Sequence, residues 1–180
     1  EILMAVKTRA DYVASLKRLR ANVYKFGERI EDVATHPATR RVVESHARAY
    51  DAANDEELSA LFTTTSALTG ERIHRHTSLM QSAEEVIFNS KLKREMFRLT
   101  GTCTGSLCAG WNAMNTMWAV THEVDGAQGT KYHERLRKWA LRAEAEGWTV
   151  AGALTDAKGN RGLKASQQSD LDSNLRIAAV

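Results

Sequence analysis

The stretch TDAKGNRG, residues 155–162, combines one acidic, two basic and two glycine residues in eight positions. A bend through Gly159 and Asn160 tolerates positive φ angles and can aim several backbone N–H groups at one point. Lys158 and Arg161 could then hold a pyrophosphate between them, with Arg161 binding two oxygens at once. On chemistry alone, a plain polar surface turn remains the favoured interpretation of this stretch.

Two cysteines, Cys103 and Cys108, lie five positions apart in the segment TGTCTGSLCAG. They cannot complete a metal site by themselves, because a structural zinc takes four ligands and an iron–sulfur cluster usually takes four thiolates. The spacing favours two small buried residues beside Gly105 and Gly110. The other interpretation is half of a metal site whose remaining ligands lie elsewhere.

The histidines and tryptophans show no spacing typical of catalysis. His74, His76, His122 and His133 lack the zinc-protease pattern and a neighbouring Cys/His cluster, so we expect solvated imidazoles or imidazoles satisfied in the core. The four tryptophans are expected to fill the core, and two of them would also line a pocket if the helix after the cysteines borders one. They are Trp111 and Trp118 on that helix, then Trp139 and Trp148.

The chain that positions these residues has helical periodicity as far as about Gly147. The expected helices cover residues 9–24, closed by Gly27; residues 37–53, with Pro37 in the first turn; a segment starting at the Ser82/Glu85 capping box; a segment after Cys108; and residues 130–146. Beyond Gly147 the period changes, and we expect short strands at residues 150–154 and 175–180.

The composition is that of one globular domain, with 180 residues, 43% of them hydrophobic and 26% charged, and a net charge of +3. Basic residues alternate with acidic and apolar ones, which is typical of solvated helix faces, so neither a nucleic acid nor a membrane is expected as a partner. The absence of a visible signal peptide and the two cysteines favour a cytoplasmic location. The start ahead of Met4 and the apolar end suggest a piece of a longer protein.

Five segments in order resemble the N-terminal part of the flavoprotein family that unites 4-hydroxyphenylacetate 3-hydroxylase with 4-hydroxybutyryl-CoA dehydratase. They are ADYVASLKRLRANVYKFGERIEDVATHP, FTTTSALTGERIHRH, CAGWNAMNTMWAVTHEVD, GTKYHERL and GALTDAKGNRGLKASQQSDLDSNLRI. The resemblance implies a mainly α fold similar to acyl-CoA dehydrogenases. After an extension at residues 1–8, a helical domain would cover residues 9–147, and residues 148–180 would start a truncated β-rich middle domain. It also implies a homo-oligomer, typically a homotetramer.

The resemblance further implies that the loop after the helical domain contacts FAD. Matched position by position, the cofactor-binding residues are Leu154, Thr155, Asp156, Ala157, Lys158, Gly159, Asn160 and Arg161. Two of them depart from the family, which usually has Pro at the position of Ala157 and Asp at that of Asn160. The first change loosens the turn, and the second keeps a side-chain acceptor but removes a charge. The substrate-side candidates are Trp111, Asn112 and Asn115.

The cysteine segment bears on the choice between the two branches of the family. In the dehydratase, two cysteines separated by three residues bind a [4Fe–4S] cluster, together with a histidine and a third cysteine further along. Cys103 and Cys108 have four residues between them, so one residue is inserted here. The hydroxylase has a Gly-Arg-x-Pro-Asp-Tyr run that holds the phenol, and CTGSLCAGWNA stands in its place, so that clamp is absent.

The leading prediction is the oxygenase component of a two-component monooxygenase of aromatic compound catabolism. It would take reduced FAD from a separate flavin reductase and hydroxylate a small phenolic substrate. The first alternative is a dehydratase-like enzyme that uses FAD and a [4Fe–4S] cluster bound partly by Cys103 and Cys108. The second is a non-catalytic helical interaction module or an inactive remnant. No catalytic residue is indicated, and these 180 residues alone are expected to have little activity and weak flavin affinity.

Overall fold

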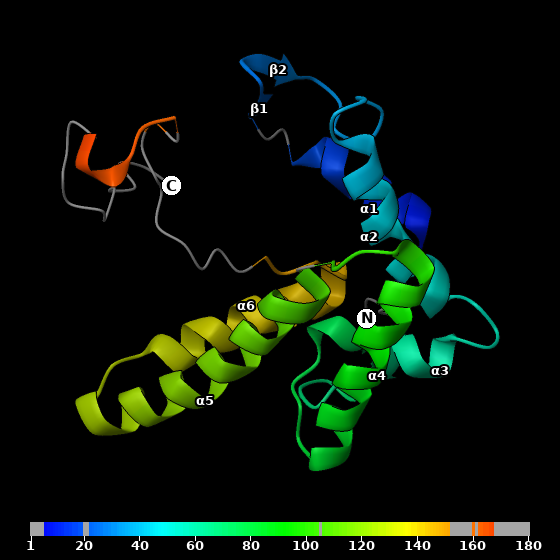
Figure 1. Ribbon diagram of the computed structural model, residues 1–180. Helices are drawn as coiled ribbons and strands as arrows, with labels where there is room; N and C mark the ends of the chain where they lie inside the picture. The colour runs from blue at the N-terminus through cyan, green and yellow to red at the C-terminus, as the bar shows by residue number, and fades with distance from the viewer. Residues whose placement is uncertain (1–5, 20–21, 105, 152–159, 161, 168–180) are drawn as a thin grey trace.

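The computed structural model describes residues 6–19, 22–104, 106–151, 160 and 162–167, and their fold is mainly helical (Figure 1). This confirms the predicted fold class. The elements in order are α1 (Arg9–Arg18), β1 (Val23–Lys25), β2 (Glu28–Ile30), α2 (Arg40–Ala53), α3 (Ser59–Phe62), β3 (Thr63–Thr65), β4 (Arg72–His74), the 3-10 turn η1 (Arg75–Thr77), α4 (Ala83–Thr100), the π-helical turn η2 (Ser106–Gly110), α5 (Trp111–Gln128), α6 (Tyr132–Glu146) and the 3-10 turn η3 (Ala165–Gln167).

Local capping chemistry sets the ends of the long helices. The Ser82 hydroxyl accepts the backbone N–H of Glu85 at the start of α4, while the Glu85 carboxylate accepts the N–H of Gln81 rather than that of Ser82. At the other end of the domain, α6 stops at Gly147, whose φ of 61° is left-handed. Glycine adopts this conformation without a steric penalty, so the predicted stop is confirmed.

The first helix is shorter than predicted. α1 ends at Arg18, and β1 and β2 form an antiparallel hairpin in place of the expected continuation to residue 24. The hairpin turn falls on Phe26 and Gly27, with φ angles of 54° and 83°. Two successive positive φ angles suit a tight hairpin turn and cannot occur within a right-handed helix. The prediction was therefore wrong beyond Arg18. The second helix begins at Arg40, a few residues after Pro37.

One hydrophobic core joins α2 to α5. Its fully buried members are Ala49, Ala52, Ala53, Phe62, Leu79, Leu92, Met96, Leu107, Trp111 and Met114. Each large side chain among them contributes roughly 1.5–3 kcal/mol by leaving water. α5 and α6 lie side by side as an antiparallel pair, and α4 crosses near the start of α5 (Figure 1). Because Leu107 and Trp111 both lie in this core, the start of α5 is held firmly.

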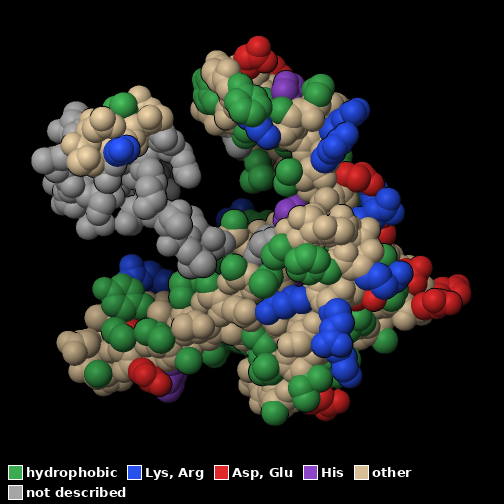
Figure 2. Space-filling model, viewed as in Figure 1, with side chains coloured by type: hydrophobic (Ala, Val, Ile, Leu, Met, Phe, Trp, Pro, Cys, Tyr) green, Lys and Arg blue, Asp and Glu red, His purple; other side chains and the backbone are tan. Residues whose placement is uncertain are grey.

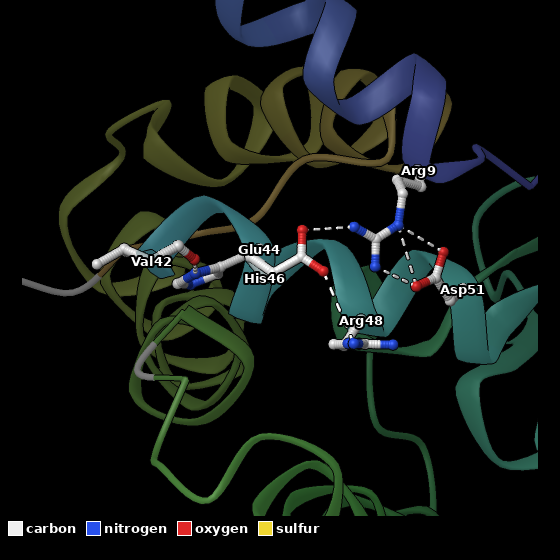
Figure 3. A network of polar contacts seen from close by, with 6 residues as sticks. All are labelled: Arg9, Val42, Glu44, His46, Arg48 and Asp51. Carbon is white, nitrogen blue, oxygen red and sulfur yellow. Dashed lines mark hydrogen bonds and ion pairs between the residues drawn. The ribbon is translucent and has the colours of Figure 1, made fainter. Parts of the chain in front are cut away.

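A second contact region ties α1 to α2. Tyr12 stacks on Tyr50, with ring centroids 4.6 Å apart. Arg9 reaches from α1 to two carboxylates of α2, with Nη1 2.7 Å from Glu44 and Nε 2.9 Å from Asp51 (Figure 3). Both the aromatic stack and the ion pairs therefore orient α1 on the same face of α2.

The segment after α6 is described only in part. Val150 and Ala151 belong to no strand, and Ala151 is exposed, whereas a short buried strand was expected at residues 150–154. Residues 152–154 and the strand expected at residues 175–180 lie outside the described residues. The boundaries of the domains therefore stay a prediction.

The surface carries charges of both signs. On the face drawn in Figure 2, Lys and Arg side chains are spread over several elements, with acidic side chains among them. In the part of the chain that the structure describes, no helix combines the length and the apolar character needed to cross a membrane.

Candidate functional site

The π-helical turn η2 carries Cys108 into the start of α5. A π turn closes its hydrogen bonds over five residues instead of four, so it accommodates one more residue than an α turn and is frequent at functional sites. Leu107 is buried in the core, and the buried indole of Trp111 donates a hydrogen bond to the Ser78 carbonyl at 2.8 Å. The turn is thus fixed on both sides of Cys108. It is also an element that can take up the residue inserted between the cysteines.

The two cysteines are free thiols with different environments. Cys103 is exposed and Cys108 is half-buried, so the interpretation of two buried small residues is wrong for Cys103. Desolvation, together with the neighbouring Cys108, raises the pKa of the Cys103 thiol. Among the described residues, no three His, Cys, Asp or Glu side chains gather where they could hold a metal ion. The pair offers two soft ligands, which suit an iron–sulfur cluster only if further ligands come from elsewhere.

The start of α5 lies against the segment that follows α6. A Cβ atom placed on Gly110 would lie 1.5 Å from the carbonyl oxygen of Val150 and 2.4 Å from its carbonyl carbon. No side chain fits in that space. The contact connects the turn that carries Cys108 to the irregular segment that precedes the predicted cofactor loop by four residues. Spacing in the sequence could not have shown this contact, because the two residues are far apart along the chain.

Of the eight predicted flavin-binding residues, the structure describes Asn160 alone; the other seven lie outside the described residues. The backbone carbonyl of Asn160 accepts the N–H of Leu163 at 3.0 Å, and its side-chain oxygen accepts the N–H of Gly162 at 2.9 Å. This is a tight turn closed by an Asx-type hydrogen bond. The acceptor that Asn160 keeps relative to Asp is therefore occupied by the Gly162 N–H.

The predicted substrate-side residues mostly hold the segment that precedes α4. Asn115 donates to the Ser78 carbonyl at 3.1 Å and accepts the Met80 N–H at 2.7 Å. Trp111 is buried in the core, and its indole N–H donates a hydrogen bond to the Ser78 carbonyl. Asn112 is exposed, and its side-chain oxygen accepts a hydrogen bond from Asn89 at 3.2 Å. A role toward substrate stays a prediction for all three residues. Asn112 is the one whose side chain is exposed.

A buried aromatic and imidazole cluster lies between α2, β4 and η1. Tyr50 meets His74 edge-on at 4.8 Å between ring centroids, and His74 lies 5.1 Å from His76. His74 contacts the Lys7 carbonyl through Nε2 at 3.1 Å, whereas its Nδ1 and both ring nitrogens of His76 are buried without a hydrogen bond of ordinary geometry. Burial lowers the pKa of His74 to about 4 and that of His76 well below its usual value. The expectation of a satisfied imidazole is therefore wrong for His76.

A cavity of about 480 Å³ opens between α1 and the end of α6. Its walls are partly aromatic, and the Arg142 guanidinium lies over the Trp148 ring at 5.1 Å. The residues that line it are Tyr12, Ser15, Leu16, Arg18, Leu19, Tyr50, Trp139, Arg142, Glu146, Gly147, Trp148, Thr149 and Val150. Trp139 and Trp148 are half-buried there, so only Trp111 among the four tryptophans is wholly buried in the core.

Comparison with known proteins shows which family this chain belongs to. The family model described as 4-hydroxyphenylacetate 3-hydroxylase N terminal matches residues 8–180. The 4-hydroxybutyryl-CoA dehydratase/vinylacetyl-CoA-Delta-isomerase of Clostridium aminobutyricum is 36% identical over 170 residues, which are 94% of this chain and 34% of that protein. This chain thus spans about a third of the length of that relative.

Solved structures show the same fold. An oxygen-tolerant archaeal 4-hydroxybutyryl-CoA dehydratase from N. maritimus is 34% identical with a TM-score of 0.80, over 93% of this chain and 33% of that one. The oxygenase component HpaB of 4-hydroxyphenylacetate 3-monooxygenase, solved with FAD and 4-hydroxyphenylacetate, is 23% identical with a TM-score of 0.62, over 92% and 33%. The second likeness concerns the fold alone. The chain belongs to the 4-hydroxyphenylacetate 3-hydroxylase N-terminal family, which includes the 4-hydroxybutyryl-CoA dehydratases.

Proposed function

We propose that this chain is the N-terminal part of an FAD-dependent enzyme and that residues 154–161 hold the phosphates of the flavin. The single observation that carries the proposal is the match of the family model to residues 8–180, which includes that loop. The HpaB neighbour is solved with FAD, and the relatives compared above are enzymes, which supports a catalytic role over a non-catalytic module.

The residues of the loop fit the phosphates of a dinucleotide. Lys158 and Arg161 would supply positive charge to the phosphate oxygens, with Arg161 able to bind two of them at once. When bound, FAD would supply one- and two-electron chemistry. The part of this chain would be to bind and orient the cofactor beside the turn that carries Cys108.

Of the two candidate reactions, dehydration of a 4-hydroxyacyl-CoA has the stronger support. Over nearly the whole chain, identity is 36% to the Clostridium dehydratase and 25% to the oxygenase component of a 4-hydroxyphenylacetate 3-monooxygenase from Geobacillus sp.. The dehydratase structure also matches the fold with a TM-score of 0.80. This reverses the order of preference that the sequence suggested. Cys103 and Cys108 would then provide two thiolates to a [4Fe–4S] cluster. A bound metal deprotonates a thiol, so it would overcome the raised pKa of Cys103.

Hydroxylation of a phenolic substrate is the second candidate. The added residue between the cysteines favours it, because a thiolate on an altered turn does not automatically reach an iron atom. The family model also takes its description from the hydroxylase. This function would require a separate flavin reductase as partner. Under either function we propose that the whole protein is a cytoplasmic homo-oligomer.

Cofactor analysis of the complete protein tests these proposals. The protein is purified without oxygen, reconstituted with FAD, iron and sulfide, and analysed for all three, beside Cys103→Ser, Cys108→Ser and the neighbouring control Thr102→Ser. About four irons per subunit that are lost in both cysteine variants and kept in the control would support the dehydratase. Flavin without iron, with oxygen consumption coupled to a hydroxylated phenol, would support the hydroxylase. A protein that binds no FAD would overturn the proposal as a whole.

A further inference from the structure

Cys103 and Cys108 are neighbours in space as well as in the sequence. The backbone N–H of Leu107 donates to the Thr104 carbonyl at 2.9 Å, which closes a turn between the two cysteines. The ends of such a turn lie within about 7 Å of each other, and one cysteine stands directly outside each end. Besides desolvation, the charge of Cys108 and a hydrogen bond between the two side chains raise the pKa of the Cys103 thiol, which requires the two sulfur atoms to be close. The thiols therefore lie side by side at one turn.

The two thiols differ in how easily a reagent from solution reaches them. Cys103 is exposed and follows two exposed residues, Gly101 and Thr102, whereas Cys108 is half-buried. Leu107, the residue before Cys108, is buried in the core, so close packing holds Cys108 in place. A dissolved reagent therefore meets Cys103 first, and Cys108 lies beside the group that forms there.

A disulfide is a reaction that this pair can complete without any other residue. It requires two Cα atoms roughly 4.4–6.8 Å apart, a range that residues flanking a tight turn reach with little movement. A [4Fe–4S] cluster usually takes four thiolates or equivalent ligands, and among the described residues no three His, Cys, Asp or Glu side chains gather in one place. Both sulfur atoms that a disulfide needs, by contrast, belong to the described part of the chain.

We propose that Cys103 and Cys108 are a redox modification site, a dithiol that a low-molecular-weight disulfide such as glutathione disulfide converts into an intramolecular disulfide. Cys103 loses its proton, and its sulfur attacks one sulfur of the oxidant, whose S–S bond breaks and releases one thiolate. Cys108 then loses its proton and attacks the Cys103 sulfur, which releases the second thiolate. The two protons and two electrons that leave the protein convert the oxidant into two thiols.

Oxidation of this pair would also regulate the proposed cluster site. Iron binds the thiolate form of cysteine, and a disulfide offers no thiolate, so the oxidised protein could not assemble the cluster of the dehydratase. This consequence rests on the proposed function. The formation of the disulfide does not, because it needs neither iron nor FAD.

The test follows oxidation of the complete protein. The protein is freed of iron with a chelator, fully reduced, and equilibrated without oxygen in buffers of glutathione and glutathione disulfide. Intact mass and peptide mapping should show the loss of two hydrogens, with Cys103 and Cys108 joined. At a fixed concentration of glutathione disulfide, the ratio of oxidised to reduced protein should fall with the square of the glutathione concentration, because two glutathione molecules form per protein disulfide. A mixed disulfide would follow the first power instead.

Single substitutions test the order of attack. Cys108→Ser should retain one glutathione on Cys103, because the sulfur that releases it is gone. Cys103→Ser should react at least about tenfold more slowly than Cys108→Ser, since Cys108 is half-buried. Thr102→Ser is the matched control and should oxidise like the unaltered protein. Circular dichroism of each variant confirms that it is folded.

The outcomes separate this inference from the proposed function. Glutathione retained on Cys103 of the unaltered protein, a disulfide between two subunits, or thiols that stay reduced would each refute the intramolecular disulfide. Equal rates in Cys103→Ser and Cys108→Ser would refute Cys103 as the site of first attack. FAD binding is titrated in parallel on the reduced protein. If the disulfide forms and no FAD binds, the proposed function fails and this inference stands; if FAD binds and no disulfide forms, the reverse holds.

Discussion

Tyr50 in α2 donates a hydrogen bond of 2.7 Å to the backbone carbonyl of Gly147, which ends α6 and lies 97 positions away in the sequence. Tyr50 is buried, and burial raises the pKa of its phenol, so the hydroxyl stays a donor at physiological pH. The bond holds the end of α6 on α2. It thereby fixes the origin of the segment that leads to the predicted cofactor loop.

Replacing Tyr50 by Phe should destabilise the fold. The variant keeps the ring stack on Tyr12 but leaves the Gly147 carbonyl without its donor, which costs about 1–3 kcal/mol for a buried group. The free energy of unfolding is measured by denaturant titration. Tyr24→Phe in the hairpin serves as the control, because Tyr24 is 65% exposed, and it should change stability by less than about 0.5 kcal/mol. Equal effects of the two substitutions would contradict the role of this bond.

The sequence predicted helix ends that depend on neighbouring residues, and it missed features that depend on contacts between residues far apart in the chain. The start of α4 at Ser82 and the end of α6 at Gly147 were correct, because a cap depends on residues within one turn. The apolar spacing that indicates α1 continues to Val23 although the helix stops at Arg18. Periodicity cannot detect that stop, because the hairpin turn includes Phe26, a residue type that rarely has a positive φ.

The same distinction holds for the candidate site. Glycines required for a positive φ and glycines required for space look alike in a sequence, so Gly147 was recognised and the role of Gly110 was not. The sequence singled out the two cysteines together, and Cys108 does lie near enough to Cys103 to raise the pKa of its thiol. The exposure of Cys103, by contrast, depends on how the chain packs around it. The prediction of a cofactor loop came from the resemblance to a family, and no packing argument could have supplied it.

The buried imidazoles should make the fold sensitive to acid. His74 and His76 have lowered pKa values because burial disfavours their charged forms, and Lys7 and His46 add positive charge nearby. Between the ordinary pKa of 6.5 and a folded value of about 4 for His74, the unfolded chain binds more protons than the folded one. Stability is therefore complete above about pH 6.5 and is lost as the pH falls toward 4. A shift of that size corresponds to about 3 kcal/mol for His74 alone.

Substitution of His76 tests this account of acid sensitivity. His76→Leu removes a titrating group whose ring nitrogens make no hydrogen bond of ordinary geometry, although the Trp148 backbone lies close enough to oppose the lowering of its pKa. The variant should lose less unfolding free energy than the unaltered chain between pH 7 and pH 5. The control is His122→Leu in α5, which makes the same replacement at an exposed position, and both variants are measured at the same pH values. A slope unaffected by His76→Leu would show that other groups govern the acid transition.

Glu144 should have the opposite effect on the pH profile. Burial raises the pKa of its carboxyl group, and the hydrogen bond from Ser66, 2.6 Å long, only partly compensates. A raised folded pKa means that stability is greatest below the ordinary value of 4.5 and falls as the pH rises through the folded value. Glu144→Gln is permanently neutral and still accepts from Ser66. It should be more stable than the unaltered chain at pH 8, on the order of 1 kcal/mol, and equal to it at pH 4.

The control for Glu144→Gln lies on the same helix. Glu146 is exposed, so Glu146→Gln makes the same chemical change without relieving a buried charge. Its unfolding free energy should follow that of the unaltered chain at both pH values. A loss of stability in Glu144→Gln at pH 8 would mean that the buried carboxylate is favourably solvated as an ion.

Arg9 should stabilise the junction of α1 and α2 through its geometry. Its guanidinium contacts Glu44 and both oxygens of Asp51, which the single ammonium group of a lysine cannot reproduce (Figure 3). Arg9 is one-third exposed, so solvent screens the pairs, and Arg9→Lys should cost only about 0.5–1 kcal/mol. The matched control is Arg48→Lys, whose single contact with Glu44 is 3.7 Å long, and it should have a smaller effect. The difference between the two variants should shrink in 1 M salt, where the Debye length is about 3 Å.

The charge of the cofactor loop should appear in the affinity for FAD. If Lys158 and Arg161 contact the pyrophosphate, Lys158→Gln and Arg161→Gln in the complete protein each remove one charge-assisted contact, worth roughly tenfold in affinity. Each should also make binding less dependent on salt, because fewer screened charges take part. Lys164→Gln is the matched control, since Lys164 is an exposed base three residues beyond Arg161 and outside the proposed contact set. FAD titrations at two salt concentrations distinguish the cases. An equal loss in all three variants would indicate a general attraction of the basic loop for anions, and no loss in Lys158→Gln and Arg161→Gln would place the flavin phosphates elsewhere.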